Sequence, residues 1–307
     1  MADPVRTDPW PDLVYHVLTH LQVSKDDASS LYSERYVDWA TELMKDAPAP
    51  QGLQRTLPDD AQLLARLYDA APSGFRIHAF PSLWDDVESF LADMPRDFRA
   101  LEWNDVRREA LAKNIAESVG TELSELLRTA VWSEWQCGYA SLWERNVRPR
   151  AETYLPVFRS HLAVAAKRLP GLNEQRLTLC HPLRVHGRVL AEGILVGVMD
   201  EELGVRELDP LLQVCHEHLV CLVQSQLPQD EAWATQADRA GHAAFMEVEG
   251  AALTAGMHLF ADGLWAKDYR EWLGRAFHSD GESAVQRLAD GEFLTPRARP
   301  IVKAITS

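Results

Sequence analysis

The chain has 307 residues, and its 31 lysines and arginines against 46 aspartates and glutamates give a formal net charge of −15. This acidic balance opposes attraction to nucleic acids and to anionic lipid, so neither is expected as a partner. No stretch approaches the apolar length of a membrane-spanning helix, and no apolar run follows a basic segment at the start, so the sequence predicts a cytoplasmic protein. Four cysteines are too few for a disulfide scaffold, and reduced thiols are expected.

The first half of the chain is expected to be nearly all helix. Residues 1–10 are rich in proline and aspartate, which indicates an irregular arm, and residues 47–58 have the composition of a linker. Apolar residues recur at helical spacing in several segments. The helices expected from this spacing cover residues 11–21, 27–44, 59–68, 83–94, 103–119, 122–143 and 152–168.

The pattern changes at Gln175. Residues 176–185 and 188–198 have the composition of strands, and His186-Gly187 between them suits a tight turn, so an antiparallel hairpin is expected. These are the clearest strand signals in the chain. The fold class that follows is mainly α with a small β-hairpin or sheet (α+β). We divide the chain into a mainly helical region, residues 1–170, and a second region, residues 171–307, with one compact unit as the alternative.

A helix over residues 209–226 is the centre of the second region. Asp209 suits its N-cap, Pro210 suits its first turn, and Pro228 ends it. Apolar residues leave it almost no polar side, so we expect it to be buried. It nevertheless carries His216-Glu217-His218 at its middle, and three ionisable residues on a buried helix are a candidate for chemistry.

The chain after this helix is expected to return to helix from about residue 230. A break or kink is predicted near Gly241, followed by helix to residue 258. Helices over residues 264–277 and 282–288 are expected next, and the final Pro-Arg-Ala-Arg-Pro segment is expected to be a loose tail.

Three segments carry a resemblance to a known family. They are the strand over residues 194–198, the helix segment Val214-Cys-His-Glu-His-Leu-Val220, and the later helix segment Val248-Glu-Gly-Ala-Ala252. In this order they resemble the core of zincin metallopeptidases, and more narrowly the glutamate-zincin branch. The resemblance covers residues 176–260. It implies an edge strand that binds peptide, a His-Glu-x-x-His helix that supplies two zinc ligands and a general base, and a glutamate ligand on a following helix.

The family motif can be carried over position by position. His216 matches the first zinc ligand, Glu217 the general base and Glu249 the third ligand. The position of the second histidine holds Val220, which offers zinc no ligand atom. The motif is therefore incomplete.

A replacement ligand would have to come from elsewhere in the chain. At about 100° per residue, neither His218 nor Cys221 projects on the face that Val220 occupies. The best candidate is His242, two turns before Glu249, provided that one unbroken helix carries both. The incomplete set predicts no bound cofactor, and zinc held by His216, Glu249 and His242 is the alternative.

Three functions remain open at this stage. The first is a zincin-like protein that has lost peptidase activity and binds a peptide or protein partner in the degenerate cleft. The second is an active zinc-dependent peptidase or hydrolase with a non-standard ligand set and Glu217 as base. The third is a helical scaffold or regulatory protein whose resemblance is accidental, in which Gly250 is only a packing glycine. A Gly-rich phosphate loop, a Cys-x-x-Cys pair and a Gly-x-Ser-x-Gly elbow are absent from the sequence.

Overall fold

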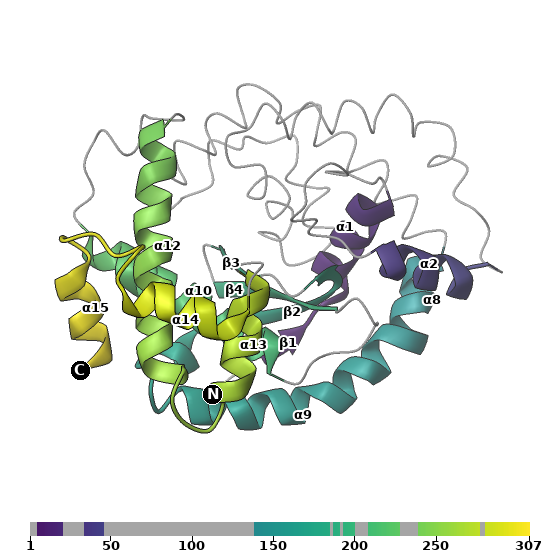
Figure 1. Cartoon of the computed structure of the whole chain (residues 1–307). Helices are drawn as coiled ribbons and strands as arrows, with labels where there is room; N and C mark the ends of the chain where they lie inside the picture. Colours follow the sequence, from purple (N-terminus) through teal and green to yellow (C-terminus); the bar gives the residue numbers. More distant parts are fainter. Residues whose placement is uncertain are drawn as a thin grey trace. The chain divides into compact units, whose positions relative to one another are not determined.

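The structure is a computed structural model that describes residues 5–20, 34–45, 138–184, 187–190, 193–199, 208–227, 239–276 and 280–307. These residues are mostly helical, with one small sheet, as the sequence predicts (Figure 1). They belong to two compact units, residues 1–156 with 176–205 and residues 157–175 with 206–307. The units therefore interleave along the chain, whereas the regions expected from the sequence, 1–170 and 171–307, are continuous.

The sheet of the first unit has the strand order β1-β2-β4-β3. Its strands are β1 (Val5–Thr7), β2 (Leu177–Arg184), β3 (Gly187–Leu190) and β4 (Gly193–Met199). β1, β2 and β4 are parallel, with Leu177 opposite both Val5 and Ile194, and only β3 runs antiparallel, beside β4. The predicted hairpin is therefore wrong in its pairing, because its two main strands lie parallel and the antiparallel pair is β3 and β4. The predicted irregular arm is also wrong, since it contains β1.

The two main strands are buried along most of their length. Every described side chain of β2 over residues 177–183 is buried, and so are those of β4 over residues 194–198. Near-continuous burial is typical of parallel strands that are covered on both faces. Gly193 lets β4 start close to β2, because a Cβ atom there would lie 2.0 Å from the Arg176 carbonyl oxygen. The adjacent Ile194 N–H donates to that same oxygen at 2.8 Å.

The described helices of the first unit come from two separate stretches of the chain, residues 9–43 and residues from 140 onward. α1 (Pro9–His20) packs on β2 and on α2 (Glu34–Leu43), and a short helix α8 (Ala140–Leu142) continues through the π-helical turn η4 (Trp143–Val147) into α9 (Arg148–Ala165). α9 contains Pro156, and the boundary between the units follows that proline. The predicted helices at 59–68, 83–94 and 103–119 lie outside the described residues, as does most of 122–143.

The second unit is built on two long helices, α10 (Asp209–Gln226) and α12 (Arg239–Phe260), which pack on each other. α13 (Ala266–Ala276) packs on α10 and on α14 (Gly281–Ala289), and α15 (Arg299–Thr306) packs on α10 and α12. A 3-10 turn, η5 (Leu172–Glu174), follows α9 in the chain.

Three sequence expectations for this unit can be checked. α10 has the predicted bounds and is buried along most of its length, although Leu208 is its N-cap and Asp209 its first helical residue. A break at Gly241 is wrong, because α12 includes this residue, while the part of the predicted helix before residue 239 lies outside the described residues. The predicted loose tail is also wrong, since it leads into α15, whose Ile301 and Val302 are buried.

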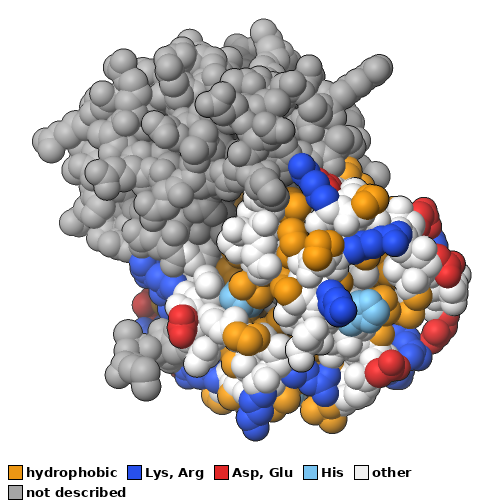
Figure 2. Space-filling view, turned by 90° about the vertical axis from the view of Figure 1, so that its left-hand side faces the viewer, with side chains coloured by type: hydrophobic (Ala, Val, Ile, Leu, Met, Phe, Trp, Pro, Cys, Tyr) orange, Lys and Arg blue, Asp and Glu red, His pale blue; other side chains and the backbone are white. Residues whose placement is uncertain are grey.

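The surface on the side of α15 carries both signs of charge. Figure 2 shows lysine and arginine side chains spread among hydrophobic ones on this face, with acidic side chains mainly toward one margin. A net charge of −15 therefore does not make this face uniformly acidic. None of the described helices combines the length and the apolar character needed to cross a bilayer.

Candidate functional site

The structure brings together the side chains of His216 on α10 and Glu249 on α12. His216 Nε2 lies 2.9 Å from Glu249 Oε1, a hydrogen bond in which the imidazole donates and the carboxylate accepts. The imidazole is 7% exposed and the carboxylate 29% exposed. The indole of Trp272 on α13 lies beside the imidazole, with ring centroids 5.7 Å apart. Residues that the family motif assigns to the first and third ligands thus meet in one place.

The spacing of this pair is close to that of two ligands on one metal ion. With zinc–nitrogen and zinc–oxygen bonds of about 2.1 Å and a tetrahedral angle, two ligand atoms lie about 3.4 Å apart. The observed 2.9 Å would have to lengthen only slightly. The described side chains nevertheless include no group of three histidines, cysteines or acids that could hold a metal ion. Val220 presents a nearly buried apolar side chain at the second ligand position.

The structure describes the side chain of Glu217 but not that of His242, the other two predicted site residues. Glu217 is buried and accepts a hydrogen bond at 3.0 Å from Nε2 of Gln213, one turn earlier on the same helix. The proposed base is thus engaged along α10. His242 lies on α12, two turns before Glu249 on an unbroken helix, but its side chain is outside the described part of the chain.

His218 has a separate environment from His216, as their angular separation on the helix predicts. It is 2% exposed, and its Nε2 donates to the Pro170 carbonyl oxygen at 3.0 Å. Its Nδ1 atom is buried and has no hydrogen-bond partner among the residues that the structure describes. Burial lowers the pKa of His218 from its usual value, and the carbonyl of Pro170 offsets part of that change. The neutral imidazole is therefore the form that the fold favours.

A pH-dependent loss of stability follows for His218. Because the pKa of His218 is lowered in the folded state, the unfolded chain binds the proton more tightly. The stabilisation is therefore complete above pH 6.5, the unfolded value, and is lost as pH falls through the folded pKa. We expect the free energy of unfolding to fall more steeply between pH 7 and pH 5 in the wild type than in His218→Gln. One proton limits the difference in slope to about 1.4 kcal/mol per pH unit. Urea titrations at each pH measure it.

The exposed His258 on α12 provides the control for this experiment. His258→Gln makes the same substitution at an exposed position of the same unit, so it controls for the loss of one imidazole side chain. Equal slopes for wild type and His218→Gln would contradict the interpretation.

A second buried ionisable cluster lies in the first unit, and sequence reasoning missed it. The carboxylate of Asp12 on α1 is fully buried and accepts hydrogen bonds from His181 Nδ1 at 2.8 Å and from the His181 backbone N–H at 2.8 Å. The indole N–H of Trp143 donates to it at 3.2 Å. The available signals were weak: an acid in a first helical turn and a histidine in an apolar strand.

Two of the described cysteines, Cys180 and Cys215, are poor nucleophiles. Burial raises the pKa of both the Cys180 and the Cys215 thiol, and the nearby Asp12 carboxylate adds to the rise at Cys180. Such thiols stay protonated near neutral pH and react slowly. Cys221 is half-buried, and Cys137 lies outside the described residues.

The residues around Glu249 on α12 hold the C-terminal segment. The Glu247 carboxylate accepts hydrogen bonds from Thr295 and, at 2.5 to 3.1 Å, from the guanidinium of Arg297, which lowers the pKa of that carboxyl. A Cβ atom on Gly250 would lie 2.2 Å from the Phe293 carbonyl oxygen. Gly250 is therefore a packing glycine.

Comparisons of the chain with protein-family models, with curated proteins and with solved structures gave no significant match. Function is therefore inferred from the chain's own residues and their geometry.

Proposed function

We propose that this protein has a zincin-like core without peptidase activity and binds a peptide or protein partner. The observation that carries the proposal is the 2.9 Å contact between His216 Nε2 and Glu249 Oε1. These residues come from two different helices, 33 positions apart, and they occupy the first and third ligand positions of the family motif. The intervening ligand position holds Val220. Two zinc-ligand positions that lie together while the remaining one holds valine favour a protein that has lost catalysis.

The sheet supplies the support for a peptide partner. β3 pairs with β4 alone among the described strands, so it lies at an edge of the sheet. An edge strand offers unpaired backbone N–H and C=O groups to which an extended peptide can add as a further strand. The zincin resemblance implies an edge strand with this role. The strand first assigned to it, over residues 194–198, is internal, and β3 replaces it in the proposal.

Introducing a histidine at the missing ligand position tests whether positions 216, 220 and 249 can form a zinc site. Val220→His places an imidazole four residues after His216, on the same face of α10. This imidazole would complete the ligand set of the family motif together with His216 and Glu249. We expect the variant to bind one zinc ion per chain with a Kd below about 1 µM, measured by competition with a chromogenic chelator. The larger side chain costs stability at a nearly buried position, so folding is checked by circular dichroism.

Two matched variants decide how the result is interpreted. Val220→His combined with His216→Ala should lose the zinc affinity, because the first of the three ligands is removed. His218→Gln in the Val220→His background should keep it, since His218 contacts Pro170 instead. If folded Val220→His binds zinc no better than the wild type, positions 216, 220 and 249 do not form a zincin-type site.

The active-hydrolase alternative has one observation in its favour. α12 runs unbroken from Arg239 to Phe260, which is the condition for His242 and Glu249 to share a helix. Zinc analysis of wild-type protein prepared without chelator tests it. About one zinc per chain, lost in both His216→Ala and His242→Ala together with hydrolysis of a peptide substrate, would favour this alternative over the non-catalytic proposal.

A further inference from the structure

The second unit contains a cavity of about 680 Å³ that shares no residue with the His216–Glu249 pair. It lies between the first residues of α10, the segment that leads into α13, and His161 on α9. Its volume is in the range typical of sites for small ligands. The cavity is therefore large enough for a molecule of amino-acid size.

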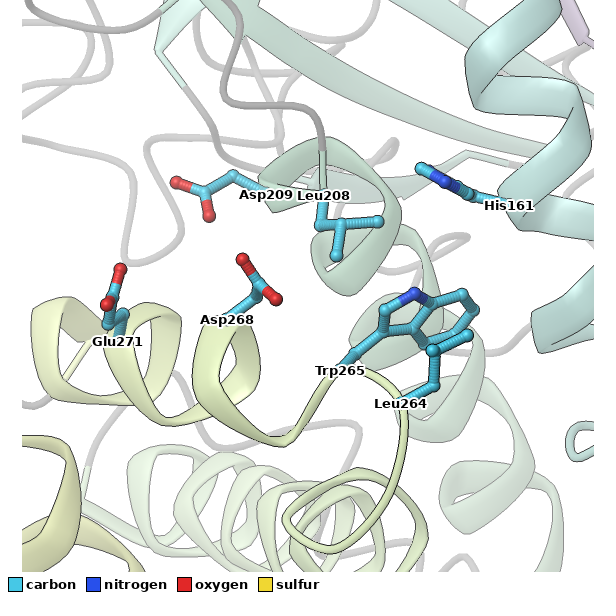
Figure 3. A pocket seen from close by; sticks show the side chains of 7 residues that line it. All are labelled: His161, Leu208, Asp209, Leu264, Trp265, Asp268 and Glu271. Atoms are coloured by element: carbon cyan, nitrogen blue, oxygen red, sulfur yellow. The ribbon is translucent and has the colours of Figure 1, made fainter.

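The wall of the cavity has an acidic side and an apolar side (Figure 3). Asp209, Asp268 and Glu271 form the acidic side, while Leu264 and Trp265 border the other. Leu264 is 74% exposed, an unusually open position for a large apolar side chain, whereas Trp265 is 6% exposed. The indole is held by the rings of neighbouring residues, with the Phe260 ring centroid 6.2 Å away. The apolar side is thus an exposed leucine beside a nearly buried indole.

The charges on the acidic side are only partly compensated. Asp209 is neutralised by Arg275, whose guanidinium lies 2.5 Å and 2.6 Å from the two carboxylate oxygens. Asp268 makes no ion pair with any described residue. The nearest cation to Glu271 is Lys267 at 3.8 Å, and both of these side chains are more than half exposed, so the pair contributes little. A ligand in the cavity therefore meets the carboxylates of Asp268 and Glu271, and on the other side Leu264, Trp265 and the imidazole of His161.

We propose that this cavity binds an organic cation with a short apolar stem, such as a guanidinium or ammonium group on an alkyl chain. The carboxylates of Asp268 and Glu271 attract the cation, and the stem lies against Leu264 and Trp265. Anionic ligands are repelled, and a bare metal ion is disfavoured because the described residues supply no group of three suitable ligands. The same chemistry is found in free amines and in the basic side chains of peptides.

Ligand-observed NMR titration with two isosteric probes tests the proposal. N-acetyl-arginine methylamide carries the cation, and N-acetyl-citrulline methylamide replaces it with a neutral urea of the same shape. We expect the arginine probe to bind with a Kd of about 1 mM or tighter and at least about fivefold more tightly than the citrulline probe. A seven-residue Gly/Ser peptide with one central arginine distinguishes a free cation from a basic side chain within a peptide. Tighter binding of the peptide than of the single residue indicates a peptide ligand, and equal binding indicates a free cation.

Exposed positions allow variants that leave the fold intact. Asp268→Asn should weaken the arginine probe about three- to tenfold and leave the citrulline probe unchanged, because only the cation interacts with the charge. Leu264→Ser should weaken both probes. Asp290→Asn on the surface after α14 makes the same change in net charge away from the cavity and should change neither.

The outcomes are distinct from those for the zincin-like site, since no variant here touches His216 or Glu249. Equal affinity for the arginine and citrulline probes, no binding of either probe at 10 times the expected Kd, or equal effects of Asp268→Asn and Asp290→Asn would each overturn the proposal.

Discussion

Replacing Asp12 with alanine is expected to destabilise the protein by about 3 to 5 kcal/mol, one of the two largest effects of a single substitution that we predict. The Asp12 carboxylate is fully buried and accepts three hydrogen bonds, two from His181 and one from Trp143. Alanine leaves all three donors buried without an acceptor. Each such donor costs about 1 to 3 kcal/mol, and part of the cost is recovered where the structure relaxes.

The measurement is the urea midpoint of unfolding, followed by circular dichroism. Asp12→Asn keeps the shape and one acceptor oxygen but turns an N–H₂ group toward existing donors, so it should recover only a fraction of the loss. Trp143→Phe removes a single donor together with part of the packing and should cost less than Asp12→Ala. Asp38→Ala, at an exposed position of α2, is the control and should change stability by less than about 0.5 kcal/mol. An Asp12→Ala variant as stable as this control would mean that the buried cluster contributes nothing.

The contrast between α10 and the sheet shows what the sequence could predict. α10 carries its own boundary signals, with Pro210 in the first turn and a proline just beyond its end, and its apolar content predicts burial without knowledge of any partner. Strand pairing has no such local code. His186-Gly187 has turn composition, yet β3, which begins at Gly187, pairs with β4, and β4 lies parallel to β2 with Gly193 close to Arg176. β1 is only three residues long, and its partner lies about 170 positions away.

The same distinction holds for the sites. The approach of His216 to Glu249 could be anticipated because both belong to segments with a recognisable motif. Asp12 and His181 are 169 positions apart and belong to no pattern, so only the packing of α1 on β2 unites them. Asp268 and Glu271 have the spacing of an ordinary solvated helix face. Their role as one wall of a cavity depends on Leu208 and Asp209, which the sequence places about 60 positions earlier.

Gly250→Ala is expected to destabilise the second unit by about 2 kcal/mol or more, although alanine is the better helix former by about 1 kcal/mol. The added Cβ would lie 2.2 Å from the carbonyl oxygen and 3.0 Å from the carbonyl carbon of Phe293. Backbone atoms cannot rotate away as a side chain can. The segment is also fixed at both sides, by the Arg287 guanidinium over the Phe293 ring at 4.8 Å and by the contacts of Arg297 with Glu247. Either α12 or this segment must move.

Gly256→Ala on the same helix is the matched comparison. The nearest atom to its added Cβ is the Tyr269 hydroxyl oxygen at 2.8 Å, the far end of a side chain, and the next is at 3.5 Å. A small movement of that ring relieves the contact, so we expect less than half of the loss at Gly250. Urea unfolding compares the two, and limited proteolysis of the segment after α14 gives a second measurement. Because Gly250 adjoins Glu249, its substitution should also weaken zinc binding by Val220→His, whereas Gly256→Ala should not. Equal stability of the two variants would show that the C-terminal segment yields easily and that the close approach of Gly250 to Phe293 contributes little to stability.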